Sequence, residues 1–209
     1  MSVLNQIAYY QNRRDEVPNQ ELAHRLAQER DAAGIAEIAA NLWHANANVQ
    51  SDCLKVLYEI GYLAPELIAG YVVDFLKLLH SRNNRMVWGS MIALSTIAHL
   101  RPDEIYAQRS LIETALETGT VITVDSATGA LAAVAAHSEP YRREIFPVLL
   151  KHLQTTRVSD VPRHAEKILP AVHAENKQAF GAVLEQRMTA MTEAQLARVK
   201  RVIRAAQTR

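Results

Sequence analysis

The sequence predicts an all-α protein, a right-handed α-α superhelix (solenoid) of about five helix pairs. Three observations indicate this fold class. Apolar residues repeat every 37 residues along the chain. Within each repeat they recur at the spacing of one face of an α-helix. The seven glycines and seven prolines lie mainly near the ends of these periodic segments, which is typical of helices joined by short turns.

The 37-residue period holds in both helices of the repeat. The apolar position of the first helix recurs in four copies at Ile38, Phe75, Ile112 and Leu149. The corresponding position of the second helix recurs at Leu57, Leu94, Leu131 and Ile168. Helix pairs of this kind cannot bury their apolar faces alone, so each pair is expected to stack on its neighbours.

The period divides the chain into three parts. Residues 1–30 are predicted to form N-terminal capping helices, residues 31–174 four repeats, and residues 175–209 a degenerate C-terminal capping pair. The expected helix pairs occupy residues 31–63, 66–100, 103–137, 140–174 and 177–206. Pro170 falls inside the second helix of the fourth pair, and it is expected to kink or split that helix because proline lacks a backbone N–H.

Polar residues mark several of the helix starts. Asn48 and Asn84 are placed to cap the second helices of the first two repeats, since an asparagine oxygen can accept a backbone N–H at a helix start. Thr192 followed three residues later by Gln195 predicts a capping box at the last helix.

The period and two local segments resemble HEAT repeats. Residues 84–87 and 161–165 are similar to the turn of a HEAT repeat and the start of its second helix. Over residues 31–174 the chain resembles the HEAT and armadillo-like repeat proteins. The resemblance implies a non-enzymatic scaffold or adaptor, whose second helices line a concave face that holds another protein or a peptide.

The second helices supply candidate contact residues. On the expected helix at 84–100, the stripe turned away from the apolar face contains Trp88 and His99. The 37-residue register maps this stripe onto Tyr58 and Tyr62 one repeat earlier, and onto Asp125 one repeat later. Because aromatic residues dominate binding hot spots, we expect these five residues to bind the partner. Packing of the aromatic rings between repeats is the alternative.

Asp125 has two further interpretations. The DNA alkylation-repair glycosylases of the HEAT-like class carry a catalytic Asp beside tryptophans near the start of such a helix, and residues 124–126 resemble that element without a nearby Trp. The resemblance implies nucleic-acid binding or a glycosylase-like activity as an alternative function. The other interpretation is an acid in the first helical turn that interacts with the helix dipole.

Charge is unevenly distributed along the chain. Residues 140–209 contain 13 Lys and Arg against 6 Asp and Glu, whereas residues 1–139 contain 10 against 16. An apolar stripe of the last helix comprises Leu196, Val199, Ile203 and Ala206. Its basic surface comprises Arg198, Lys200, Arg201 and Arg204. This helix is expected to cap the solenoid; binding of nucleic acid, an acidic protein or an anionic membrane is the alternative, and a membrane is not among the expected partners. The oppositely charged ends allow homo-oligomerisation.

Other function classes lack their sequence signals. Cys53 is the only cysteine, which excludes an internal disulfide or a thiolate-rich metal site, and the eight histidines have no metal-ligand spacing. His80 and His152 are expected to interact with the last carbonyls of first helices. We therefore expect no catalytic residue, no metal and no cofactor. With no signal peptide at its start and no stretch of membrane-spanning length, the chain is expected to be cytoplasmic.

Overall fold

The computed structural model describes residues 2–209, of which the great majority are helical. These residues contain twelve α-helices and no β-strand. They form two compact units, unit 1 extending to Ile105 and unit 2 comprising Tyr106–Arg209. None of the helices within residues 2–209 is both long enough and apolar enough to span a lipid bilayer.

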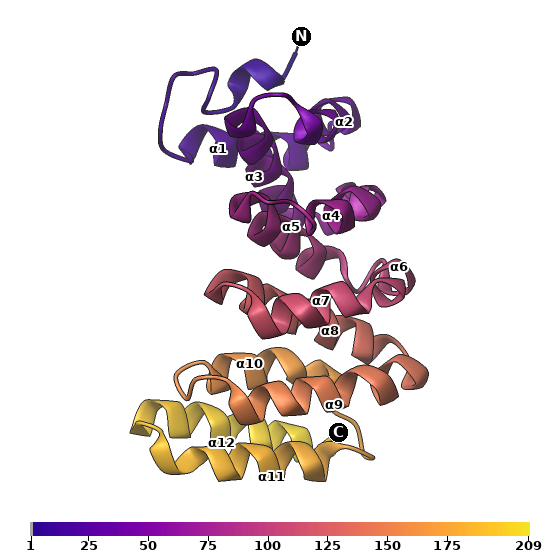
Figure 1. Cartoon of the computed structure of the whole chain (residues 1–209), viewed down its shortest axis with the longest axis vertical. Helices are drawn as coiled ribbons and strands as arrows, with labels where there is room; N and C mark the ends of the chain where they lie inside the picture. Colours follow the sequence, from indigo (N-terminus) through magenta and orange to yellow (C-terminus); the bar gives the residue numbers. More distant parts are fainter. Residues whose placement is uncertain (1) are drawn as a thin grey trace. The chain divides into compact units, whose positions relative to one another are not determined.

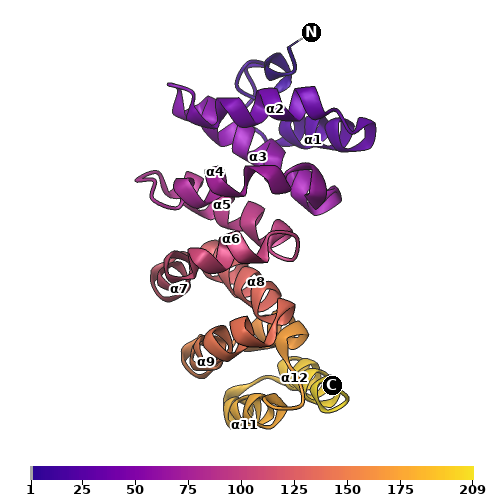
Figure 2. The same cartoon turned by 90° about the vertical axis from the view of Figure 1, so that its right-hand side faces the viewer.

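Unit 1 is built from a leading helix and two helix pairs. Its helices are α1 (Val17–Glu29), α2 (Ala32–Ala40), α3 (Ala47–Leu63), α4 (Val72–Leu78) and α5 (Asn84–Ile97). α1, α3 and α5 pack side by side and form the second-helix layer of unit 1, while α2 packs against α3 and α4 against α5 (Figures 1 and 2). A further short helix, α6 (Pro102–Ala107), contains the boundary between the units.

Unit 2 is built from three helix pairs. They are α7 (Arg109–Thr118) with α8 (Val121–His137), α9 (Glu139–Thr155) with α10 (Val161–Ile168), and α11 (Lys177–Arg187) with α12 (Glu193–Gln207). α8 packs on α10 and α10 on α12, which gives the second-helix layer of unit 2. α9 packs against both α7 and α11, so the first helices form a layer of their own (Figure 1).

The apolar positions of the 37-residue period form the cores of the two units. All eight of them are fully buried: Ile38, Leu57, Phe75, Leu94, Ile112, Leu131, Leu149 and Ile168. Cys53 is also fully buried, and burial raises the pKa of its thiol to about 12. The thiol therefore stays protonated and packs as a small apolar side chain.

The second helices of unit 1 approach each other closely where α3 meets α5. A Cβ atom added at Gly89 would lie 2.7 Å from a methyl carbon of Leu54, so either the Leu54 side chain or the helix would have to shift. Glycine at this position lets Leu54 pack directly against the backbone of α5.

The structure corrects two predicted helix caps. Asn46 and Asn83 are the capping residues, and each side chain accepts a hydrogen bond from the backbone N–H two residues later. The predicted caps Asn48 and Asn84 are wrong, because they lie inside the first turns of α3 and α5. The capping box at Thr192 is confirmed.

Several first helices are more interrupted than their periodicity predicts. The helix expected from residue 66 is replaced by two 3-10 turns, Pro65–Leu67 and Ala69–Tyr71, which precede α4. Gly70 lies in the second turn, and glycine disfavours a continuous helix. The helix expected from residue 103 is split into α6 and α7.

The second helix of the fourth pair is also interrupted, as expected from its proline. Pro170 lies in a 3-10 turn directly after α10, which ends at Ile168.

An ion-pair network joins the second helices of unit 1. Lys55 on α3 is only 8% exposed, and its Nζ lies 2.8 Å from Glu16 at the start of α1 and 2.7 Å from Glu59. Arg85 on α5 also contacts Glu16, at 3.3 Å. Burial lowers the pKa of Lys55, but its hydrogen bonds to both carboxylates and to Tyr58 outweigh burial and hold that pKa above its ordinary value.

We expect Lys55→Ala to lower the free energy of unfolding by about 1–2 kcal/mol, because it leaves two carboxylates close together without their shared cation. Urea unfolding followed by circular dichroism measures the change. Lys77→Ala, an exposed lysine on α4, is the matched control and should change stability by less than about 0.5 kcal/mol. Equal effects of the two substitutions would contradict a role of Lys55 in joining the helices.

Candidate functional site

The second-helix layer of unit 1 carries three aromatic rings in contact, here called the aromatic cluster: Tyr58, Tyr62 and Trp88. The ring centroid of Tyr58 lies 6.2 Å from that of Tyr62 and 6.1 Å from that of Trp88. The two tyrosines are four residues apart on α3 and so share one face of that helix, and Trp88 reaches them from α5. The structure therefore brings three of the five predicted contact residues together.

The three rings differ in accessibility. Tyr58 is 5% exposed and packs between helices, with Lys55 Nζ 4.8 Å from its ring centroid. Trp88 is half-buried, and Tyr62 is 61% exposed. Tyr58 thus supports the two rings that a partner could reach. Packing between helices, the alternative weighed for these residues, describes Tyr58 but not Tyr62.

The remaining predicted positions of this stripe are placed differently. Three further side chains at positions of this stripe are buried, because α1, α3 and α5 pack closely side by side: Ser51, Lys55 and Ile92. His99 lies in the exposed turn after α5, which ends at Ile97 instead of residue 100. Helical register therefore does not place His99 on the stripe of Trp88, and that prediction lacks its geometric basis.

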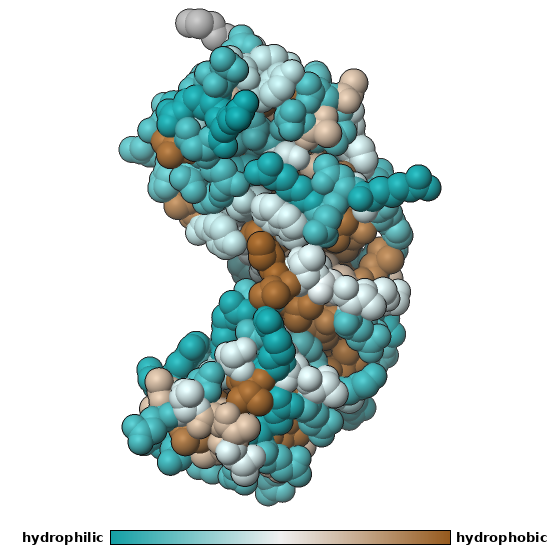
Figure 3. Space-filling model, turned by 60° about the vertical axis from the view of Figure 1, so that its left-hand side comes forward, coloured by the Kyte–Doolittle hydropathy of each residue, from teal (hydrophilic) through white to brown (hydrophobic). Residues whose placement is uncertain are grey.

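A hollow of about 700 Å³ runs along α1 and reaches α3. It is lined by Val17, Gln20, Glu21, His24, Arg25 and Gln28 of α1 and by Glu59 of α3. Glu59 precedes Tyr62 by three residues and so lies on the same side of α3. In the space-filling view the surface of unit 1 is mostly hydrophilic, with small separate hydrophobic patches (Figure 3). No sequence pattern indicates this hollow, since residues 1–30 are expected to act as a cap.

In unit 2, Asp125 connects α8 to α10 through ion pairs. Its Oδ2 atom accepts a hydrogen bond from Lys167 Nζ at 2.7 Å, and its Oδ1 atom lies 2.9 Å from Arg163 Nε. Lys167 also donates to the backbone carbonyl of Asp125, at 2.9 Å. The interpretation of Asp125 as a first-turn acid is wrong, because α8 begins at Val121 and has no acidic residue in its first turn.

The surroundings of Asp125 give no support to glycosylase chemistry. Both carboxylate oxygens are engaged by cations of the same chain. Unit 2 contains no tryptophan, since Trp43 and Trp88 both belong to unit 1. A flipped base would need aromatic side chains to stack on; in unit 2 the phenylalanines Phe146 and Phe180 are buried, and the partly buried Tyr106 and Tyr141 stack on each other.

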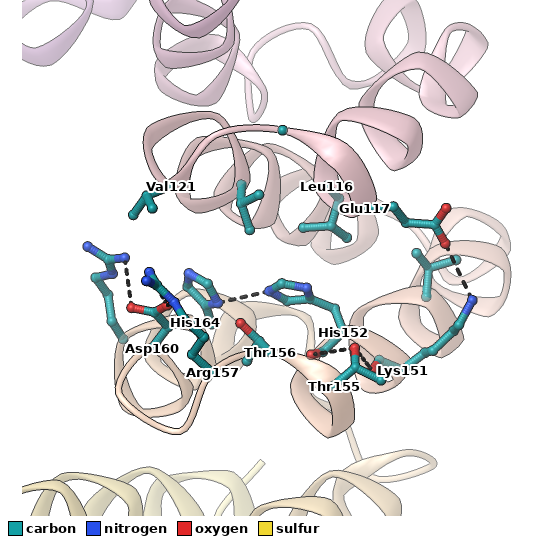
Figure 4. A pocket seen from close by; sticks show the side chains of 14 residues that line it. Leu116, Glu117, Val121, Lys151, His152, Thr155, Thr156, Arg157, Asp160 and His164 are labelled. Carbon is teal, nitrogen blue, oxygen red and sulfur yellow. Dashed lines mark hydrogen bonds and ion pairs between the residues drawn. The ribbon is translucent and has the colours of Figure 1, made fainter.

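A pocket of about 360 Å³ in unit 2, here called the histidine pocket, lies between α7–α8 and α9–α10 (Figure 4). Apolar side chains line part of it: Leu116, Val121, Val124 and Val148. Charged side chains lie around them: Glu117, Lys151, Arg157, Asp160 and Arg163. His152 and His164 complete the lining, together with Gly119, Thr155 and Thr156.

The two histidines of this pocket form a hydrogen-bonded pair, with His152 Nε2 2.8 Å from His164 Nδ1 (Figure 4). His164 is 1% exposed, and burial, with the neighbouring His152 second, lowers its pKa to about 4. Burial also lowers the pKa of His152. Both rings are therefore neutral near pH 7. The expectation that the His152 ring interacts with helix carbonyls is wrong, because the ring bonds to His164 across the turn between α9 and α10.

The predicted basic surface lies on α12, whose other face seals unit 2. Val199, Val202 and Ala206 are buried, so Val202 replaces Leu196 and Ile203 as the centre of the apolar stripe. Arg198 forms a two-pronged ion pair with Glu166 of α10, at 2.6 and 3.0 Å. Three exposed cations have no ion pair within the described residues: Lys200, Arg201 and Arg204.

Within residues 2–209, no group of three or more His, Cys, Asp or Glu side chains is arranged to hold a metal ion.

No protein-family model and no curated protein matches the sequence. Solved structures do match the whole chain. A designed armadillo repeat protein in complex with the peptide (KR)4 is 17% identical, with a TM-score of 0.71 over 98% of this chain and 100% of the other. A second designed armadillo repeat protein is 15% identical, with a TM-score of 0.68 over 97% and 99% of the two chains.

A third similar structure is that of an engineered protein, 20% identical, with a TM-score of 0.69 over 100% of this chain and 98% of the other. Identities of this size show the fold alone. The chain has an armadillo- and HEAT-like all-α repeat fold, which confirms the fold class that the 37-residue period predicts.

The histidine pair makes stability depend on pH. Because the folded pKa of His164 is about 4 against an ordinary 6.5, the unfolded chain binds the proton first as the pH falls. Stability should be nearly constant above about pH 7 and decrease by about 2 kcal/mol between pH 7 and pH 5. Urea unfolding at several pH values in this range measures the decrease.

His164→Gln should flatten this dependence, whatever its effect on stability at pH 7. His137→Gln removes an exposed histidine of the same unit and should leave the wild-type slope in place. A wild-type slope in the His164→Gln variant would show that other groups cause the pH dependence.

Proposed function

We propose that the protein is a non-enzymatic repeat scaffold, which binds a peptide segment of another protein on the second-helix layer of unit 1. The exposure of Tyr62 carries this proposal. Its ring is 61% exposed, yet it stands edge-on to Tyr58, which in turn packs against Trp88. An exposed aromatic ring that is already held in place loses little conformational entropy on binding, and such rings are typical binding hot spots.

The hollow along α1 supports an extended peptide as the bound segment. Gln20 and Gln28 line it and are exposed. A glutamine amide can both donate and accept hydrogen bonds, as a peptide backbone requires. Tyr62 would hold an apolar side chain of the segment, while the hollow would hold its backbone. The designed armadillo repeat protein that holds the peptide (KR)4 has a similar fold, and this supports peptide binding as a use of the fold.

The proposal is tested by selecting peptides from a random phage-displayed library on the immobilised protein. The selected peptides should bind Tyr62→Ala and Trp88→Ala about tenfold or more weakly than they bind the wild type. Isothermal titration with synthetic peptides measures the affinities. Because Tyr62 is exposed, its substitution should change the melting temperature little, whereas Trp88→Ala removes a half-buried ring and should lower it moderately.

Tyr10→Ala is the matched control, since Tyr10 is a 44% exposed tyrosine of unit 1 that lies outside the second-helix layer. Peptides that bind all three variants as they bind the wild type would refute the aromatic cluster as the site.

Nucleic-acid binding by α12 is the second candidate function, and the three exposed cations without ion pairs favour it. Phosphate binding by Lys200, Arg201 and Arg204 should weaken steeply with salt, because each neutralised phosphate releases a counterion. Substituting all three with alanine should reduce the slope of log affinity against log salt by about 2–3. Fluorescence anisotropy with a short labelled DNA duplex measures this slope. An unchanged slope, or no binding by the wild type at low salt, would exclude this function.

A further inference from the structure

We propose that the histidine pocket of unit 2 is a second binding site, which takes an aromatic side chain with a hydrogen-bond donor from a partner peptide. The donor is the phenol of a tyrosine or the indole N–H of a tryptophan. This site belongs to unit 2 and shares no residue with the aromatic cluster of unit 1. The proposal for one site can therefore be tested independently of the proposal for the other.

The size and lining of the pocket fit one aromatic side chain. Its volume of about 360 Å³ is at the lower end of the roughly 300–1,000 Å³ that ligand pockets span. Leu116, Val124 and Val148 provide apolar contacts for a ring. Val121 also lines the pocket and is 52% exposed, and the next residue, Ile122, is 46% exposed. Apolar surface thus continues outside the pocket, where the flanking residues of a peptide would cover it.

The charges around the pocket favour a neutral ligand over an anion. Lys151 pairs with Glu117 at 3.3 Å, and Arg157 pairs with Asp160 at 2.8 Å. Arg163 contacts Asp125 at 2.9 Å and Asp160 at 3.5 Å. Each cation of the lining therefore already has a carboxylate partner, and an anionic ligand would have to displace it.

The contact of His164 with Asp125 and its hydrogen bond to His152 determine which ligand group the pocket accepts. His164 Nε2 is buried without a hydrogen bond, and it lies 3.6 Å from Asp125 Oδ1. A proton on Nε2 faces the carboxylate favourably, whereas a lone pair there would be repelled. His164 Nδ1 must then accept the hydrogen bond from His152 Nε2.

His152 is left with an unprotonated Nδ1, because its single ring proton is on Nε2. The described chain supplies no hydrogen bond to this Nδ1, and His152 is part of the pocket lining (Figure 4). The pocket thus offers an acceptor without a hydrogen bond, His152 Nδ1, beside apolar walls. A phenol O–H or an indole N–H satisfies that acceptor while its ring fills the apolar part.

Two small probes that differ by one hydroxyl test the proposal on the unmodified protein. N-acetyl-tyrosinamide should bind about fivefold more tightly than N-acetyl-phenylalaninamide, because only its side chain has a hydroxyl that can donate to His152 from within the pocket. Titrations followed by ¹⁵N NMR give both affinities, and the Nδ1 resonance of His152 should move only with the tyrosine probe. Equal affinities, or an unmoved Nδ1 resonance, would overturn the proposal.

Two variants locate the site. His152→Phe should abolish the preference for the tyrosine probe, and Val148→Phe should fill the pocket and weaken both probes. Tyr62→Ala should leave both affinities unchanged, so a failed peptide selection on unit 1 would not affect this result. Circular dichroism checks that each variant is folded, and the comparison of the two probes on the wild type needs no variant.

A third probe distinguishes a peptide from a free small molecule as the natural ligand. Acetyl-Leu-Tyr-Leu-amide should bind more tightly than N-acetyl-tyrosinamide, because its leucines cover Val121 and Ile122. Ile122→Ser, a substitution outside the pocket lining, should reduce this gain and leave the affinity of the smaller probe unchanged. No gain from the flanking leucines would overturn the assignment to a peptide.

Discussion

The packing of each second helix against the second helix of the next repeat is the interaction on which each unit depends. A single helix pair leaves one side of its apolar residues uncovered, and the neighbouring pair covers it. The close approach of α3 and α5 at Gly89 shows how tight this contact is. It also explains why Lys55 and Ile92 are buried, although their helical positions suggested an exposed stripe. Of the three rings of the aromatic cluster, Tyr62 is the one that this packing leaves most exposed.

Ion pairs follow the same repeat-to-repeat relation. Several join residues separated by about one repeat, for example Arg30 with Glu66, Arg109 with Glu144, and Glu166 with Arg198. Most of these pairs are exposed and contribute little individually. Lys55 and Asp125 are different, because each bridges neighbouring second helices from a partly or fully buried position. The charges of Lys55 and Asp125 therefore stabilise the contacts between neighbouring repeats.

The fold could be predicted from the sequence because the contacts between stacked repeats require apolar residues at regular intervals along it. The same apolar position recurs every 37 residues, as in Phe75 and Ile112, and this recurrence requires a repeated contact. The candidate site was only partly predictable. The register correctly related Trp88 to the tyrosines of α3, but it could not show which ring is covered by a neighbouring helix. The pairing of His152 with His164 depends on how two helices meet across a turn, and local spacing carries no information on that.

The buried thiol of Cys53 provides a way to measure local opening of unit 1. Its sulfur lies fully within unit 1, and its raised pKa keeps it in the unreactive thiol form. An alkylating reagent can therefore reach it only after α3 has separated from its neighbours. Because the chain has no other cysteine, the rate of alkylation reports a single event, the opening of unit 1. The alkylation rate of Cys53 in the unmodified protein therefore measures how often unit 1 opens.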